Sequence, residues 1–207
     1  MIPALPPTKK PVMNTDPAEI IITTPRLSLR SWRDEDLPLM AAINADAAVM
    51  KHFPKCLTAD ETLQHLQRIK NHHDQKGYFL YAVELTATHE FIGFVGLNCP
   101  TFTIPRFIPQ GLPVVEIGWR LSSRHWRQGY ATEAARAVLD YAFTQLKLEE
   151  VISFTVVANL PSRAVMAKIG MQHHDADDFD HPMLTADSPL LRHVLYRLTR
   201  KEYLASQ

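Results

Sequence analysis

The stretch that decides the fold reads Trp126-Arg127-Gln128-Gly129-Tyr130-Ala131-Thr132. It lies between an apolar, strand-like segment at 114–121 and a segment at 129–146 whose apolar residues have helical spacing. Small residues leave backbone N–H groups uncovered at such a turn, and the helix N-terminus adds the positive end of its dipole. The turn therefore predicts a phosphate or pyrophosphate site, although an ordinary strand-to-helix turn would show the same single glycine.

Strand and helix signals alternate on both sides of this turn. Thr58 followed by Glu61 is a capping-box signature, and Gly77 is placed to end the helix that begins there. Asp34 or Asp36 is placed to cap a shorter helix before it. Early hairpins followed by strand–helix alternation predict a mixed α/β sheet. Strands are expected at 20–30, 79–85, 91–97, 114–121, 151–157 and 193–198, with 151–157 at the centre of the sheet. The main helices in the later part of the chain are expected at 129–146 and between Pro161 and Gly170.

Two segments carry unusual charge. Arg26 and Arg30 alternate with leucines, so the first strand is expected to have an arginine-rich polar edge. Residues 175–189 read as an acidic loop, which would attract a cationic amine if it bordered a cleft.

Length and composition indicate one globular domain, at 19–204, after a disordered tail at 1–18 that is rich in proline. Lys plus Arg equals Asp plus Glu at 22 each, so no net positive field favours nucleic acid. No apolar run is long enough to span a membrane, and no signal peptide is recognisable. Cys56 and Cys99 fit reduced thiols, which predicts a cytoplasmic protein. The proline-rich loop 99–113 carries apolar side chains that favour a homodimer.

Four blocks in a fixed order carry a resemblance: Thr24-Pro25-Arg26-Leu27, Glu116-Ile117-Gly118-Trp119, the turn at 126–133, and Asn159-Leu160-Pro161-Ser162. Together they closely resemble the GNAT family, in the branch that contains the ribosomal-protein N-terminal acetyltransferases. The resemblance covers about residues 24–198. It implies a single-domain α/β GNAT fold, with a mostly antiparallel sheet that splays between the fourth and fifth strands, 114–121 and 151–157, and is flanked by helices.

The resemblance also implies acetyl-CoA as cosubstrate. Its pyrophosphate would bind backbone donors of 127–132, and its pantetheine arm would pair with the end of the fourth strand. Trp126 stands where the family has Arg or Gln. Asn159 is expected to lie outside the capping position and to bond the pantetheine amides, the alternative being a plain Asx turn. The implied cofactor-binding residues are Trp119, Arg120, Leu121, Arg127, Gln128, Gly129, Tyr130, Ala131, Thr132 and Asn159.

Direct acetyl transfer to a primary amine needs a base and benefits from an acid. Glu116 follows two valines, and an apolar setting would raise its pKa into the range of a general base; the alternative is an ion pair with a neighbour. Many family members place a tyrosine acid where this chain has Met166, which cannot donate a proton. Ser162 is then the candidate acid, against a role in merely capping its helix.

Several alternatives stay open at this point. The acceptor is a protein N-terminal α-amine by resemblance, while a polyamine, an aminoglycoside or another small amine remains possible. A CoA-binding regulatory module without turnover is a rival, and a toxin-like enzyme acting on aminoacyl-tRNA would need a basic cleft. The histidines at 173, 174 and 181 match no tetrahedral motif, so no metal is expected.

Overall fold

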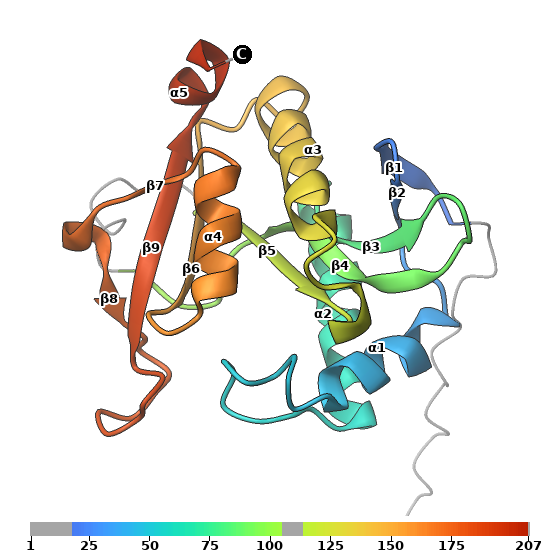
Figure 1. Ribbon diagram of the computed structural model, residues 1–207, viewed down its shortest axis with the longest axis horizontal. Coiled ribbons are helices and arrows are strands. Elements are labelled where there is room, and N and C mark those ends of the chain that lie inside the picture. Colours follow the sequence, from blue (N-terminus) through green and yellow to red (C-terminus); the bar gives the residue numbers. More distant parts are fainter. Residues whose placement is uncertain (1–17, 105–113, 207) are drawn as a thin grey trace, which may run out of the picture.

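The computed structural model describes residues 18–104 and 114–206. The expected disordered tail and the central part of the proline-rich loop lie outside the described residues. The strands form one sheet in the order β1-β2-β3-β4-β5-β6-β9-β7, with β8 paired to β9 (Figure 1). All pairs are antiparallel except β5 with β6, so the prediction of a mostly antiparallel mixed sheet is confirmed.

Helices flank this sheet, and Figure 1 shows α3 in front of β4 and β5 with α2 behind them. The strands are β1 (Ile20–Thr23), β2 (Leu27–Arg30), β3 (Leu80–Leu85), β4 (Phe91–Asn98), β5 (Glu116–Leu121), β6 (Glu150–Val156), β7 (Gln172–His173), β8 (Phe179–Asp180) and β9 (Arg192–Thr199). The helices are α1 (Asp36–Ala45), α2 (Ala59–Lys76), α3 (Tyr130–Thr144), α4 (Leu160–Lys168) and α5 (Arg200–Ala205), with 3-10 turns η2 (Ser123–His125) and η3 (Asp175–Asp177).

The expected first strand is two strands, so that prediction was wrong. The chain reverses after β1, where Thr24 donates its N–H to Leu27 O and accepts from Leu27 N with its hydroxyl oxygen. Pro25 suits this reversal because it has a fixed φ and no N–H to offer a ladder. The prediction that Arg30 belongs to an arginine-rich polar edge was also wrong, because this residue is 1% exposed.

Helix boundaries follow the capping chemistry of the sequence for α2 but not for α1. Thr58 and Glu61 form the expected capping box, and Gly77 ends α2 at φ 75°. The residue before α1 is Glu35, which makes no side-chain cap. Asp36 does not cap α1 because its carboxylate binds the guanidinium of Arg30 instead.

The two halves of the sheet separate between β5 and β6. These parallel strands share one register pair, Glu116 with Ile152, and Ile152 donates its N–H to Val115 O at 2.9 Å. Beyond that pair β5 stays on β4 while β6 stays on β9, and Figure 1 shows the two strands diverging. The predicted splay between 114–121 and 151–157 is therefore confirmed.

The C-terminal part is more structured than its acidic composition suggested. Within 175–189, η3 and β8 interrupt the expected loop because Phe179 is buried against Ile152 and Leu195. The short strand β7 and the final helix α5 had no clear periodic signal and were not predicted. Across the described residues, no helix is both long and apolar enough to cross a membrane.

Candidate active site

A cavity of about 460 Å³ opens where β5 and β6 part. It is lined by residues of β5, β6, the start of α4, the segment between α1 and α2, and the segment between β8 and β9. Five of the residues expected from the sequence line it together: Glu116, Trp119, Arg120, Asn159 and Ser162. The remaining expected residues, Leu121 and the turn 127–132, do not line it.

Glu116 occupies the point at which the two strands separate. Burial raises the pKa of its carboxyl to about 8. Within the described part of the chain, this carboxylate makes no hydrogen bond or ion pair, in contrast to the alternative of a partnered glutamate. A carboxyl that is partly shielded from water and faces a cavity is suited to exchange protons near neutral pH.

The edge of β5 that faces β6 is open past this point. Ile152 bonds Val115 O, so strand alternation directs the backbone groups of Ile117, Trp119 and Leu121 into the gap. Leu121 O already accepts the indole N–H of Trp126 at 2.9 Å. The backbone N–H and C=O groups of Arg120 point the other way, toward β4, so only its side chain reaches the cavity.

The turn before α3 offers backbone donors outside the cavity. Gly129 is the N-cap at φ 84° and supplies no side-chain cap, and Arg127 has φ 60°. Among the described residues, no acceptor bonds the backbone N–H groups of 127–132. Arg26 braces the turn, donating to Gln128 O at 3.0 Å and pairing with Glu133 at 2.6 Å. Consecutive free amides at a helix N-terminus are suited to an anion such as a pyrophosphate.

Asn159 departs from its expected position. It is the N-cap of α4, and its side-chain oxygen accepts from Ser162 N at 3.4 Å, so the expectation that it lies outside the cap was wrong. The reason is spacing: Pro161 is the second helical residue, which leaves Asn159 at the capping position. Its amide nitrogen donates to Thr155 Oγ1 at 2.9 Å. The Ser162 hydroxyl has no hydrogen bond among the described residues, and buried Met166 also lines the cavity.

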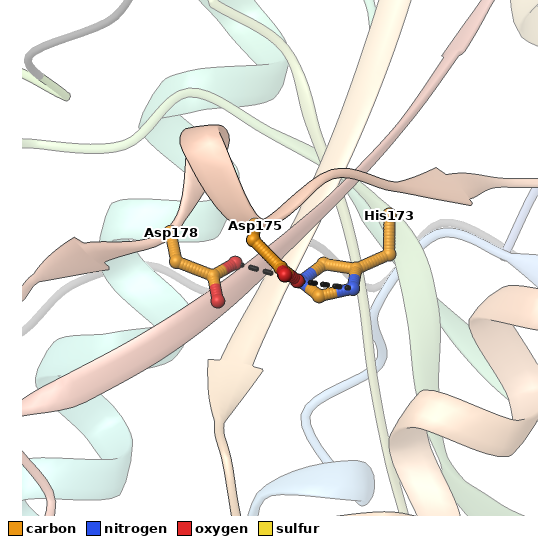
Figure 2. A group of neighbouring side chains, drawn as sticks. All are labelled: His173, Asp175 and Asp178. Carbon is orange, nitrogen blue, oxygen red and sulfur yellow. Dashed lines mark hydrogen bonds and ion pairs between the residues drawn. The ribbon is translucent and has the colours of Figure 1, made fainter.

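The acidic segment brings His173 close to Asp175 and Asp178, as Figure 2 shows. The imidazole bonds Asp178 through Nε2 at 2.8 Å, while Nδ1 lies 3.8 Å from Asp175. Each ring nitrogen thus faces a different carboxylate, and the ring stacks on Tyr196. A hydrogen bond and a ring contact thus hold the imidazole in place.

Sequence reasoning missed most of the cavity wall. One side carries His52, Phe53, His65 and Phe94, and the other carries Phe102, Phe154, His181 and His193. His181 and His193 have ring centroids 4.9 Å apart. No local motif marks these residues, since they come from segments that only the tertiary fold brings together.

A sheet that splays beside a turn suited to an anion, with a carboxyl at the fork, is the arrangement that the resemblance to the acetyltransferases implies. The chain belongs to the GNAT acetyltransferase family: the family model described as "Acetyltransferase (GNAT) domain" matches residues 26–172. It is an acyltransferase that uses acetyl-CoA for N-acetylation, and the predicted family and fold are confirmed.

Several named acetyltransferases are similar to this chain. FsC-acetyl coenzyme A-N(2)-transacetylase of Aspergillus fumigatus is 33% identical over 195 residues, which cover 92% of this chain and 80% of that protein. A GNAT-family acetyltransferase of Bacillus anthracis superposes with a TM-score of 0.70 at 25% identity, covering 87% and 99% of the two chains. Spermidine N-acetyltransferase of Vibrio cholerae, in complex with CoA and spermine, shares the fold with a TM-score of 0.66 at 20% identity, covering 86% and 98%.

Proposed function

We propose that this acetyltransferase acts by direct transfer on a primary α-amine, of a protein N-terminus or of a small compound, with Glu116 as the general base. The observation that carries the proposal is the unpartnered Glu116 carboxyl at the fork of the sheet, with a pKa raised to about 8 by burial. In its ionised form, which a pKa of about 8 leaves at about one tenth of the population at pH 7, this carboxyl would take the proton of the attacking amine, directly or through water.

Matching of proton affinities favours an α-amine over a lysine ε-amine. An α-ammonium has a pKa of about 7.7 to 8, so its proton passes to a base of pKa about 8 at almost no cost. An ε-ammonium has a pKa of about 10.4, and the same transfer would cost roughly 3 kcal/mol. The name of the Aspergillus fumigatus relative, which specifies an N(2) position, is consistent with transfer to one defined nitrogen.

The other site residues have distinct proposed roles. Acetyl-CoA supplies the acetyl thioester. The free amides of 127–132 would hold its pyrophosphate, and the open backbone of Trp119 with the N–H of Leu121 would pair with its pantetheine arm. Asn159, although it caps α4, lines the cavity and would orient the same arm. Ser162 would act on the departing thiolate by donating a hydrogen bond from its hydroxyl; a thiol pKa near 8.5 makes this contribution smaller than that of the base.

The test is free-thiol release from acetyl-CoA with a panel of peptides and small amines. We expect release with α-amine acceptors, and Glu116→Gln should lower kcat at pH 7 by about 10²- to 10³-fold. The deficit should shrink above pH 9, where the acceptor amine is already neutral. Glu149→Gln, at an exposed site, is the matched control and should behave as the wild type.

Two outcomes would contradict the proposal. Equal turnover by the wild type and Glu116→Gln at pH 7 would remove Glu116 as base. Binding of CoA without release of thiol across the whole panel would instead favour the regulatory module.

A further inference from the structure

Arg120 lies in the cavity wall on the same face of β5 as Glu116. The two side chains are four residues apart on one strand, which places their Cα atoms about 13 Å apart. Gly118 lies between them, and a Cβ added there would meet no atom within 4 Å. The floor between the carboxyl and the guanidinium is therefore open space.

The guanidinium is held by neutral groups. Nη1 donates to Asn44 Oδ1 at 2.6 Å, and the buried amide of Asn44 is itself fixed by donating to Thr62 Oγ1 at 3.0 Å. The cation lies 4.2 Å from the ring centroid of Phe53 and 5.5 Å from that of Phe94. These contacts fix its position without neutralising its charge.

No carboxylate among the described residues pairs with Arg120. Its Nε is fully covered and lacks a hydrogen-bond acceptor, although buried donors are normally bonded. Burial lowers the pKa of Arg120 to about 10, which still leaves it charged at neutral pH. A positioned cation with unused donors at a cavity wall is the arrangement that recognises an anion.

The rest of the cavity does not supply the missing negative charge. Among the described lining residues, Glu116 is the one carboxyl, and at pH 7 a pKa of about 8 leaves it mostly protonated. Burial lowers the pKa of the four lining histidines, so they are neutral: His52, His65, His181 and His193. The cavity therefore carries a net positive charge before any acceptor enters, which opposes a polycation such as a polyamine.

We infer that Arg120 binds a carboxylate of the acceptor, so that this acetyltransferase selects compounds with a primary amine at one end and a carboxylate at the other. The inference rests on the proposed function, since the amine end is placed by Glu116. An extended tripeptide spans about 10 Å, which is comparable with the roughly 13 Å that separate the Cα atoms of Glu116 and Arg120. Short peptides and amino-acyl compounds with a free carboxylate are thus the substrate class that the geometry selects.

The test compares Ala-Ala-Ala with Ala-Ala-Ala-amide in the thiol-release assay. Two peptide bonds separate the ends, so the amines have nearly equal pKa values and the pair differs only in the distant charge. In the wild type we expect kcat/KM for the free acid to exceed that for the amide by about 10- to 100-fold. Arg120→Gln, which removes the charge but keeps a polar side chain, should bring this ratio close to one.

Matched measurements separate the possible failures. Arg68→Gln removes an exposed cation from α2 and should keep the wild-type ratio. If Arg120 only supported Phe53 and Asn44, Arg120→Gln would lower both acceptors equally, and the inference would be wrong. A wild-type ratio near one would also overturn it, while leaving the proposed function intact.

Absence of turnover with both peptides would count against the proposed function. The inference is then decided by calorimetry on the CoA-saturated wild-type protein. Tighter binding of the free acid than of the amide supports a carboxylate site at Arg120, and equal binding overturns it.

Discussion

Two arginines of the same sheet, Arg30 and Arg120, both carry a charge that is shielded from water, but only Arg30 is paired with carboxylates of the described residues. Arg30 in β2 bonds Asp36 at 2.7 and 2.8 Å and Glu84 at 2.8 Å, all three side chains being almost fully buried. Burial alone would lower the pKa of Arg30, yet the two carboxylates raise it above its ordinary value. Arg120 in β5 has an amide and two aromatic rings in place of carboxylates, and its pKa falls.

The difference separates a charge that holds the fold together from one that remains available. The Arg30 group ties β2 to α1 and β3, and its donors are used within the protein. Arg120 keeps donors unused beside a cavity. A buried cation without a counterion is costly, so its presence there is better explained by a ligand than by stability.

Replacing each arginine by methionine tests this contrast directly and should give the largest effect. Arg30→Met leaves Asp36 and Glu84 buried without their main cation, so we expect a loss of about 3 to 5 kcal/mol in the free energy of unfolding. Arg120→Met removes an unpaired cation but also leaves Asn44 Oδ1 without its donor, so these terms should cancel to within about 1 kcal/mol. Urea denaturation at pH 7 measures both.

The effect of added salt on stability provides a second test of the contrast between Arg30 and Arg120. The buried Arg30 group is shielded from added ions, so the difference in unfolding free energy between the wild type and Arg30→Met should persist in 1 M NaCl. Similar losses for the two variants would mean that Arg120 is as structural as Arg30, and the contrast would fail.

Two glycines that face each other across β4 and β5 extend the comparison to the backbone, with a smaller expected effect. A Cβ on Gly96 would lie 2.2 Å from Phe79 O, whereas one on Gly118 would meet nothing within 4 Å. Gly96→Ala should therefore cost about 2 to 3 kcal/mol of unfolding free energy through backbone displacement. Gly118→Ala should leave the melting temperature close to that of the wild type while raising the acceptor KM.

Thermal melts and steady-state kinetics check this pair. An unstable Gly118→Ala, or a Gly118→Ala with an unaltered KM, would show that the open space beside Gly118 does not receive the acceptor.

The sequence predicted the fold well wherever the signal was local. The capping box of α2, the apolar face of α3 and the β-branched run of β6 are short-range patterns, and each element was found where it was expected. The first hairpin was missed because Ile20–Thr23 and Leu27–Arg30 share one alternating pattern across the turn. Capping of α1 was misassigned because Asp36 is recruited by Arg30, a contact that requires the folded sheet.

The same distinction between local and long-range signals applies to the residues of the site. Glu116, Asn159 and Ser162 follow from family blocks, and the structure brings them to one cavity, where their catalytic roles stay predictions. Arg120 was expected to contribute as part of a strand edge, but its side chain matters through the absence of a counterion. Such an absence is a property of packing: it depends on Asn44, Phe53 and Phe94, which come from other elements.

Two glutamates, Glu84 and Glu116, show a similar contrast in how stability depends on pH, and the effect expected here is the smallest. For Glu84, burial acts to raise the pKa, but hydrogen bonds from His89 and Arg30 lower it overall, so its stabilising contribution is lost as pH falls. Glu116 has the opposite sign. Its pKa is about 4.3 in an unfolded chain and about 8 in the fold, so between these values the folded state binds more protons and stability falls as pH rises.

Glu116→Gln abolishes this titration. The variant should therefore gain about 1 to 3 kcal/mol over the wild type between pH 4.5 and pH 8.5, less than the full pKa difference implies because water reaches the cavity. Urea denaturation at several pH values measures the gain, and the exposed Glu149→Gln should show none. A constant difference between Glu116→Gln and the wild type would mean that the carboxyl ionises normally, and the match with an α-amine would lose its basis.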